Sequence, residues 1–197
     1  LFRSSINISF NTKSCNCIDN NLEGKEEETQ FDAALEMTLK TIEFAREREA
    51  IPFAVFKPTG FGRLDLYEKV GEKAVLTVAE QEEWSRVIAR FDLACKTAYE
   101  KDVLLLIDAE ESWMQEAADA IVTDMMRKYN KQKAIVFNTL QMYRWDRLDY
   151  LKQLHEQART EGFYIGMKLV RGAYMEKENE RAAERGLKSP ICISKEA

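Results

Sequence analysis

The stretch Met167-Lys168-Leu169-Val170-Arg171-Gly172-Ala173-Tyr174 is an apolar run that gives way to charged residues, a glycine and an aromatic residue where a buried strand would end. Three earlier segments end in the same way. They are 53–56 followed by Lys57-Pro58-Thr59-Gly60, 103–107 followed by Asp108-Ala109-Glu110-Glu111, and 134–137 followed by Asn138-Thr139-Leu140-Gln141. Because each run is continuous rather than alternating, it predicts a parallel strand covered on both faces.

Helical periodicity fills the segments between these strands. Apolar residues recur at helical spacing over about 27–49, 77–98, 114–129, 145–160 and 176–185. Thr77 and Glu80 form a capping-box pattern, and Gly162 predicts the end of the fourth helix. Gly60 and Gly62 predict a turn that brings the backbone close to a ligand. Four strand-helix units in succession predict either a doubly wound sheet or an arc of a barrel.

The barrel is favoured because the nucleotide-binding signatures of the open-sheet folds are missing. No GxGxxG follows a strand, and no GxxxxGK[ST] occurs. We therefore predict the α/β class and a partial (β/α)₈ TIM-type barrel. A complete barrel takes about 250 residues and eight strands, so four strands leave an open edge on each side. We expect residues 25–197 to form the N-terminal half of such a barrel. This half is either a fragment or a unit that must pair with a partner to close the barrel.

The first 24 residues are rich in Ser, Asn and Thr and predict an irregular or flexible segment. The chain begins with Leu1, and we interpret this as the cut end of something longer. The composition, with 45% hydrophobic and 32% charged residues, is typical of a soluble globular protein. No apolar run approaches the roughly 20 residues of a transmembrane helix. A net charge of -5 gives no reason to expect nucleic acid as a partner.

The cysteines and the single histidine exclude several kinds of site. Cys15, Cys17, Cys95 and Cys192 form no CxxC pair, which makes a zinc site improbable and predicts no metal. Cys15 and Cys17 remain as a weak candidate for a redox or metal pair. His155 falls on a predicted helix away from the strand ends, so we expect a surface or boundary residue and no Ser-His-Asp or Cys-His mechanism.

Six polar or aromatic side chains follow the four strands. Because the carboxyl ends of parallel strands meet at one end of a sheet or barrel, we expect these side chains to share a rim. They are Lys57, Asp108, Gln141, Lys168, Arg171 and Tyr174. A cationic group with one carboxylate suits a bound anion, such as a substrate carboxylate or a cofactor phosphate. The alternative for each residue is that it only solvates the sheet edge.

The same strand ends resemble, in order, successive motifs of the proline dehydrogenase family. The matching stretches are Val55-Phe56-Lys57-Pro58-Thr59-Gly60-Phe61-Gly62, Ile107-Asp108-Ala109-Glu110-Glu111, Asn138-Thr139-Leu140-Gln141-Met142-Tyr143 and Lys168-Leu169-Val170-Arg171-Gly172-Ala173-Tyr174. The resemblance runs from about residue 23 to residue 197. Four motifs in order, each at a predicted strand end, make this resemblance specific.

The resemblance implies a flavoprotein on a (β/α)₈ barrel that oxidises L-proline to Δ1-pyrroline-5-carboxylate in proline catabolism. A hydride passes to FAD, and a quinone or another membrane acceptor takes the electrons. The resemblance places Lys57 on the substrate carboxylate and Tyr174 in the wall of the substrate pocket. It gives Asp108 a catalytic position beside the substrate, where it orients cationic partners. It places Lys168, the second catalytic residue, close to the flavin.

A further set of residues is implied as cofactor-binding. They are Ala109, Gln141, Val170, Arg171, Gly172 and Ala173. Gln141 is expected to hydrogen-bond the ring system, and Gly172 to allow close approach of the backbone. Strand packing is the alternative role for Ala109 and Val170. The arginines that clamp the proline carboxylate in the family would lie beyond residue 197, so the remainder of the barrel is an expected partner, and a molecule ending there should neither bind FAD tightly nor turn over proline.

Two other functions remain open. A Schiff-base lyase or aldolase could use Lys57 or Lys168 as its lysine, and a truncated barrel half could be a non-catalytic interaction module. Adjacent strand residues point to opposite faces, so we expect one of Glu110 and Glu111 to be a salt-bridge partner within the barrel and the other to be solvated. The compartment is either the bacterial cytoplasm with peripheral membrane association or the mitochondrial matrix and inner membrane.

Overall fold

The structure, a computed structural model, describes residues 7–9, 18–19, 28–48 and 50–193. The strands are β1 (Asn7–Ser9), β2 (Ile18–Asp19), β3 (Phe53–Phe56), β4 (Leu104–Ile107), β5 (Val136–Gln141) and β6 (Gly166–Val170). The α-helices are α1 (Glu28–Arg46), α2 (Leu64–Gly71), α3 (Val78–Lys101), α4 (Ser112–Tyr129), α5 (Arg147–Glu161) and α6 (Met175–Arg185). A short 3₁₀ helix, η1 (Pro58–Gly60), follows β3.

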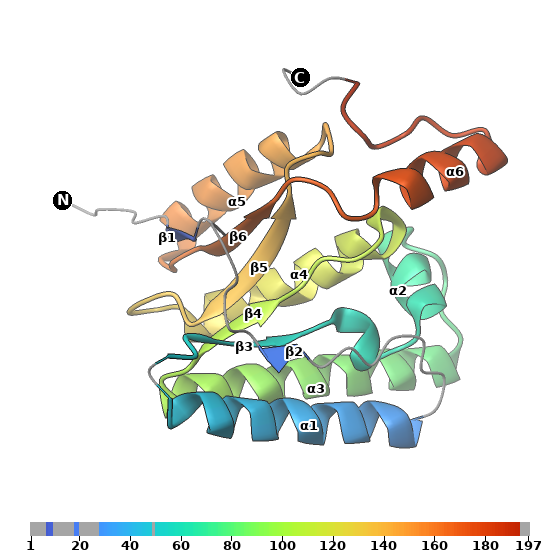
Figure 1. Ribbon diagram of the computed structural model, residues 1–197. Coiled ribbons are helices and arrows are strands. Elements are labelled where there is room, and N and C mark those ends of the chain that lie inside the picture. The colour runs from blue at the N-terminus through green and yellow to red at the C-terminus, as the bar shows by residue number, and fades with distance from the viewer. Residues whose placement is uncertain (1–6, 10–17, 20–27, 49, 194–197) are drawn as a thin grey trace.

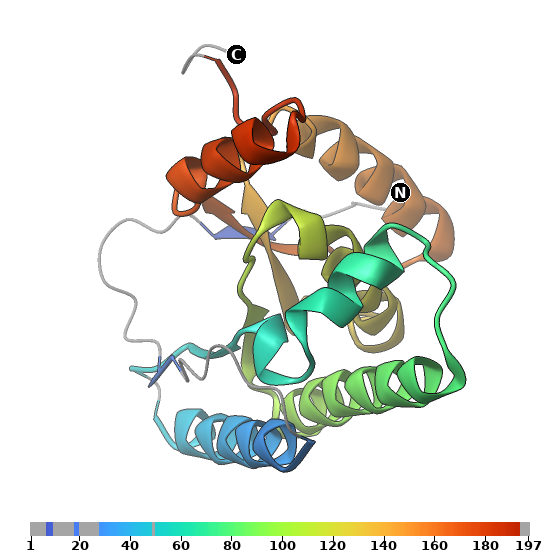
Figure 2. The same ribbon diagram turned by 90° about the vertical axis from the view of Figure 1, so that its right-hand side faces the viewer.

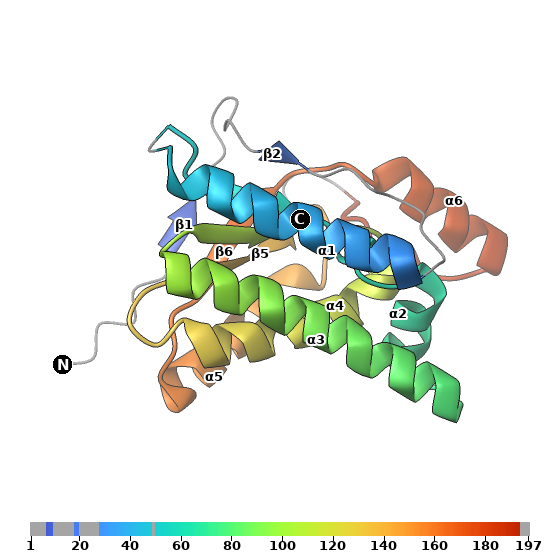
Figure 3. The ribbon, with the colours of Figure 1, turned by 90° about the horizontal axis from the view of Figure 1, so that it is seen from below.

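The strands form one sheet with the order β1-β6-β5-β4-β3-β2, and every pairing is parallel. The helices lie outside the sheet, with α1 and α3 side by side below β3 and β4 (Figure 1 and Figure 3). In Figure 2 the helices follow one another in an arc around the strands. Helices α3, α4 and α5 pack in chain order, as expected for the outer ring of a barrel. The predicted partial (β/α)₈ barrel is confirmed.

The two faces of the sheet carry different side chains, because successive strand residues point to opposite sides. Residues that face the helices belong to the main hydrophobic core, including Phe56, Ile107 and Met167. Alternate residues face the inside of the arc, where Val55, Leu106 and Phe137 form a separate buried cluster. At about 25 cal/mol per Å² of buried apolar surface, the main core is the principal source of stability. The inner cluster is the apolar floor beneath the strand ends.

The predicted helix ends are borne out where local capping chemistry fixes them. The side chain of Thr77 accepts a hydrogen bond from the backbone of Glu80, and the Glu80 carboxylate accepts one from the backbone of Thr77. This capping box satisfies two N–H groups that the first turn leaves unpaired. Gly162 follows α5 in the left-handed conformation with φ of 69°, which costs glycine little.

Two elements differ from the sequence-based expectation. The sequence pattern does not predict helix α2, because its eight residues are too short a stretch for helical spacing to stand out and they follow closely on the turn after β3. Leu66 and Tyr67 are nevertheless fully buried, and α2 packs on α4. Strand β5 continues to Gln141, beyond the expected end at residue 137, because 138–141 pair with β6 although three of the four side chains are polar.

Two short stretches within residues 1–24 are strands. Strand β1 pairs with β6, and β2 pairs with β3. These are the two edges that four strands alone would leave open, and their unpaired N–H and C=O groups are templates for added strands. The rest of the first 24 residues, with Cys15 and Cys17, lies outside the described part of the chain.

No helix among the described residues is long and apolar enough to span a membrane.

Candidate functional site

Four polar side chains form one row across the inner face of the sheet. The register pairs Phe56 with Ile107, so the next position along each strand aligns Lys57 with Asp108. A hydrogen bond of 3.0 Å from the backbone N of Asp108 to the carbonyl of Phe56 continues this pairing. Leu106 pairs with Phe137, which aligns Asp108 with Thr139, and Thr139 pairs directly with Lys168. We call Lys57, Asp108, Thr139 and Lys168 the polar row.

Asp108 is the centre of this row. The ammonium of Lys168 lies 2.5 Å from its Oδ1, and the hydroxyl of Thr139 lies 3.2 Å from the same oxygen. The same hydroxyl also lies 2.9 Å from the carbonyl oxygen of Ile107, so its one hydrogen is shared between two acceptors. The side chains of Lys168 and Asp108 are 21% and 18% exposed, so the ion pair is largely shielded from solvent. Both contacts fall on Oδ1, and Oδ2 takes part in neither.

Gln141 lies one step further towards the rim, at the end of β5. It pairs with Val170 of β6 and is only 1% exposed. Its Nε2 donates to the carbonyl of Glu110 at 2.6 Å and to the hydroxyl of Tyr143 at 2.9 Å, while its Oε1 accepts from Arg144 at 3.1 Å. The protein therefore uses both N–H groups of the Gln141 amide, which leaves only an Oε1 lone pair for the predicted flavin contact.

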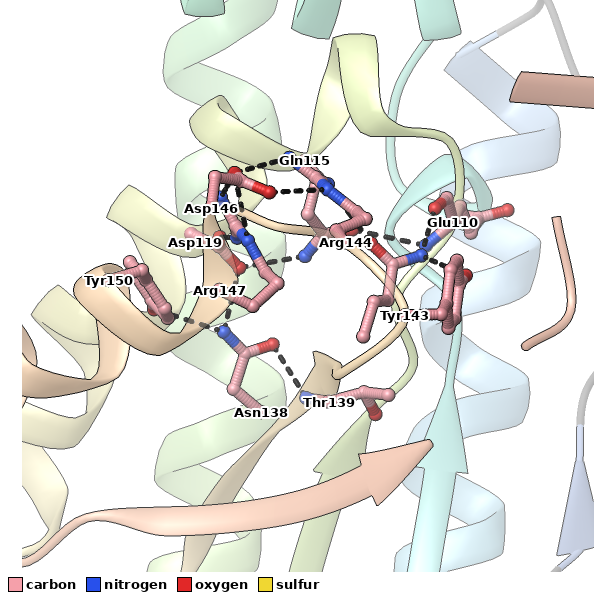
Figure 4. A network of polar contacts seen from close by, with 11 residues as sticks. Glu110, Gln115, Asp119, Asn138, Thr139, Tyr143, Arg144, Asp146, Arg147 and Tyr150 are labelled. Carbon is pink, nitrogen blue, oxygen red and sulfur yellow. Dashed lines mark hydrogen bonds and ion pairs between the residues drawn. The ribbon is translucent and has the colours of Figure 1, made fainter. Parts of the chain in front are cut away.

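A closed circuit of hydrogen bonds holds Gln141 and Glu110 together. Figure 4 labels its other members. Its seven members, which we call the polar ring, are Glu110, Gln115, Asp119, Arg147, Asp146, Arg144 and Gln141. Gln115 accepts from the backbone of Glu110 and donates to Asp119 at 2.7 Å, and Arg147 bridges Asp119 and Asp146. The ring joins the ends of β4 and β5 to α4 and α5.

The centre of the ring is a buried ion pair. Arg147 donates to Oδ2 of Asp119 at 2.7 Å, and Asn138 donates to Oδ1 at 2.8 Å. Coulombic attraction to Asp119 and hydrogen bonding to Asp146 raise the pKa of Arg147, although burial opposes this. Both charges are buried and their contacts are satisfied, so the pair fixes the positions of α4 and α5 at this end of the sheet. Removing one partner would leave a buried charge unpaired and would strongly lower the stability.

Glu110 is buried at the base of the rim. Its carboxylate accepts from the backbone N of Thr59 at 3.0 Å and from the Thr59 hydroxyl at 2.8 Å. Burial raises the pKa of Glu110, while the two Thr59 hydrogen bonds and the charge of Lys57 lower it. Glu110 therefore couples the end of β3, where Lys57 lies, to the end of β4.

The expectation that one of Glu110 and Glu111 is solvated is wrong. Glu110 is 3% exposed and Glu111 is 7% exposed. Glu111 forms an ion pair with Lys177 of α6. Beside it, the buried Glu178 accepts from the backbone N and the hydroxyl of Ser112, both at 2.6 Å. Helix α6 thus covers the start of α4, and a strand-end pattern cannot show this because α6 comes more than 60 residues later.

The stretch after β6 is open. Arg171, Gly172 and Ala173 are exposed. A depression of ≈ 540 Å³ is lined by Gly172, Ala173, Tyr174 and the first turns of α6. A Cβ on Gly172 would lie 2.8 Å from Sδ of Met175, which is the movable end of a flexible side chain. Gly62 serves packing rather than a ligand, since a Cβ there would lie 2.5 Å from Cγ2 of Val87.

The structure places the sequence-predicted residues at four neighbouring positions. Lys57, Asp108 and Lys168 share the polar row, and Gln141 and Val170 form the next step. Ala109 is buried between Asp108 and Glu110. Arg171, Gly172, Ala173 and Tyr174 form the open stretch next to the rim.

Sequence reasoning missed Thr139 and Tyr143. Thr139 could have been found from strand parity, because it stands two residues before Gln141 and so shares its face. Tyr143 has no such signal, because it lies beyond the strand. His155 lies in the middle of α5 and is half-buried, as expected for a residue at the boundary between surface and interior. Among the described residues, no group of three or more His, Cys, Asp or Glu side chains could hold a metal ion.

Comparisons with known proteins give a consistent result. The family model described as proline dehydrogenase matches residues 9–197. A carbapenem antibiotics biosynthesis protein, CarD, of Pectobacterium carotovorum subsp. carotovorum is 38% identical over 161 residues, which are 82% of this chain and 43% of that protein. Mitochondrial proline dehydrogenase 1 of Homo sapiens is 41% identical over 121 residues, which are 61% of this chain and 20% of that protein.

The solved structures agree on the fold. Proline utilization A of Bradyrhizobium japonicum superimposes with a TM-score of 0.74 at 19% identity, over 91% of this chain and 18% of that one. The corresponding protein of Bdellovibrio bacteriovorus gives a TM-score of 0.72 at 15% identity, over 97% of this chain and 20% of that one. The chain spans less than half the length of these curated relatives and solved structures.

Proposed function

Because the chain belongs to the proline dehydrogenase family, we propose that it supplies the N-terminal part of a barrel that oxidises L-proline to Δ1-pyrroline-5-carboxylate with FAD as the hydride acceptor. The observation that carries the proposal is the polar row. Lys57, Asp108 and Lys168 come from three different strands and align on the inner face above an apolar floor. Such a mouth suits a small zwitterion with an apolar ring.

Lys57 is the residue that binds the substrate carboxylate. Its neighbour in the row, Asp108, has one carboxylate oxygen engaged by Lys168 and Thr139. A charge-assisted hydrogen bond from an ammonium to a carboxylate is about twice as strong as a neutral one. Asp108, fixed by Lys168 and Thr139, then orients the cationic groups around the substrate through Oδ2. Tyr174 closes the pocket from the stretch after β6.

The residues present fit a flavin on the side of β6. Lys168 supplies a partly buried positive charge there, and the exposed backbone of 171–173 leaves N–H and C=O groups for a ligand. The oxygen of the Gln141 amide keeps one lone pair, and Ala109 contributes main chain beside Asp108. FAD, when bound, supplies the acceptor for one hydride, which carries the two electrons of the oxidation. Lys168 stabilises negative charge at that position, and the apolar floor excludes water.

The test is an absorbance spectrum of the purified complete protein before and after L-proline is added under anaerobic conditions. The proposal predicts a yellow preparation whose flavin band bleaches on addition of proline. A colourless preparation that takes up no FAD, or a flavin band that proline leaves unchanged, contradicts it. Glycine at the same concentration is the control for non-specific reduction.

The lyase alternative requires a neutral lysine that attacks a carbonyl. The side-chain nitrogen of Lys168 is engaged by the carboxylate of Asp108, which argues against that role. Borohydride reduction in the presence of a carbonyl substrate would trap an adduct on Lys57 or Lys168 if the chain were a lyase. The proposal predicts no such adduct by mass spectrometry.

The electron acceptor we propose is a quinone or another membrane carrier, and the remainder of the barrel is the partner of this half. Several relatives are named mitochondrial. For this chain, the mitochondrial matrix side and the bacterial cytoplasm with peripheral membrane association both remain proposals. Fractionation of cells that express the complete protein, with and without added proline, tests membrane association.

A further inference from the structure

Tyr143 follows the end of β5, and its hydroxyl lies between Gln141, an expected cofactor residue, and Tyr174, which follows the expected cofactor stretch 170–173. Gln141 donates to this hydroxyl from Nε2 at 2.9 Å. The backbone of Tyr174 hydrogen-bonds to the same oxygen. The residue is buried, and its backbone carbonyl accepts from the N–H of Cys192 at 2.8 Å. The position of the phenol is therefore fixed from both ends.

The direction of the hydrogen bonds at this oxygen is determined by the neighbours of Gln141. Arginine only donates, so Arg144 requires the Oε1 of Gln141 to face it. The carbonyl of Glu110 only accepts, so it requires the Nε2 of Gln141 on the opposite side. Both constraints give the same orientation of the amide. The Tyr143 oxygen must therefore accept from Gln141.

The N–H of Tyr174 is also a donor, so the phenolic oxygen accepts twice. Neither partner can take the hydroxyl hydrogen. Within the described part of the chain, no hydrogen bond from that hydroxyl to an acceptor is found. A buried donor without an acceptor costs about 1–3 kcal/mol, so such a group in a functional region points to a ligand.

We propose that Tyr143 is a cofactor-binding residue that donates its hydroxyl hydrogen bond to an acceptor oxygen of the bound FAD. Of its two protein partners, Gln141 is an expected cofactor residue, and Tyr174, expected in the wall of the substrate pocket, directly follows the stretch 170–173 expected along the cofactor. Burial keeps the hydroxyl protonated by raising the pKa of Tyr143. This inference rests on the proposed function, because it takes FAD as the ligand.

Replacement by phenylalanine alone does not separate the possible roles. Tyr143→Phe removes the donated hydrogen bond and also leaves the N–H groups of Gln141 and Tyr174 without an acceptor. Site-specific incorporation of a fluorinated tyrosine at position 143 separates them, because fluorination acidifies the phenol and changes little else. The ionised phenol still accepts from Gln141 and Tyr174, but it can no longer donate.

The measurement is the Kd of FAD for the complete apoprotein as a function of pH, followed by flavin fluorescence, with phenolate absorbance reporting ionisation. The expected result is a rise of roughly 3- to 10-fold in Kd as the fluorinated phenol ionises, the effect of losing one hydrogen bond. The unmodified protein should show no rise over the same range. Fluorinated tyrosine at Tyr150, which accepts from Asn138 on the helix side of the sheet, is the matched control.

An unchanged or lower Kd on ionisation overturns the inference, because a residue that only accepts would hold Gln141 and Tyr174 more firmly as a phenolate. An unchanged Kd with a raised KM for proline also overturns it, by assigning the hydrogen bond to the substrate. A protein that binds FAD but is not bleached by proline refutes the proposed reaction and leaves the FAD titration valid. A native protein without affinity for FAD refutes both.

Discussion

Lys168 and Asp108 lie 60 residues apart in the chain, and their side chains meet at 2.5 Å across β6, β5 and β4. Thr139, on the intervening strand, contacts the same carboxylate oxygen. This arrangement places a cation and an anion side by side at the mouth of the half-barrel, with the anion held from two sides.

Removing the cation should impair flavin chemistry. Lys168→Met in the complete protein keeps the length of the side chain and removes its charge. We expect the rate of flavin reduction by proline, or the retention of FAD, to fall at least about tenfold, because positive charge near the reduced ring is lost. Stopped-flow reduction and flavin content measure this. Lys152→Met, in an exposed pair with Asp149, is the control, and equal kinetics in both variants would remove Lys168 from the site.

Lys57→Ala should act on the substrate rather than on the cofactor. A charge-assisted hydrogen bond contributes about 1.5–3 kcal/mol, so we expect the KM for proline to rise roughly 10- to 100-fold. Flavin content should stay close to that of the unmodified protein. Steady-state kinetics over a range of proline concentrations, with the flavin content determined on the same samples, provides the test. An unchanged affinity for proline would refute the carboxylate role.

Thr139 should act by holding Asp108. Thr139→Val keeps the shape and removes the hydroxyl, so the carboxylate loses one of its two contacts. We expect kcat/KM for proline to fall about 3- to 10-fold, the effect of one hydrogen bond, and Thr139→Ser to restore most of it. A valine variant and a serine variant with the same reduced activity would point to packing alone.

The ion pair of Asp119 and Arg147 should control stability. Arg147→Met leaves a buried carboxylate with one partner fewer, and we expect the free energy of unfolding to fall by about 3–5 kcal/mol. Urea denaturation followed by tryptophan fluorescence measures the change. Arg159→Met breaks an exposed pair with Glu156 and should cost no more than about 0.5 kcal/mol. Similar losses in both variants would contradict the role of the polar ring.

Glu110 should make stability fall as the pH rises. Burial raises the pKa of this carboxyl above its ordinary value of 4.5. Between 4.5 and the raised pKa, the folded state keeps a proton that the unfolded state has lost. The contribution of Glu110 to the free energy of unfolding is complete when the pH is below the ordinary pKa. It is lost as the pH rises through the raised pKa. Glu110→Gln removes this titration.

The measurement is the difference in the free energy of unfolding between the unmodified protein and Glu110→Gln at several pH values. This difference should move in favour of the variant as the pH rises from about 4.5 to about 8. A difference that is independent of pH over this range would show that Glu110 ionises in the folded protein as it does in the unfolded one.

The sequence alone determined the fold class and the order of β3 to β6 and of every α-helix except α2, because these depend on patterns only a few residues long. Continuous apolar runs identify buried strands, and Thr77 and Gly162 mark helix ends through contacts within one turn. The polar residues that follow each strand were also readable, since parallel strands place their carboxyl ends together.

Only the tertiary structure decided which of these residues meet. The polar row depends on register, and a shift of one residue would turn Thr139 away from Asp108 and Lys168. The burial of Glu111 depends on α6, and the orientation of Gln141 depends on Arg144 and Glu110 acting from opposite sides. Each of these is set by hydrogen bonds between segments far apart in the chain, whose geometry no local pattern contains.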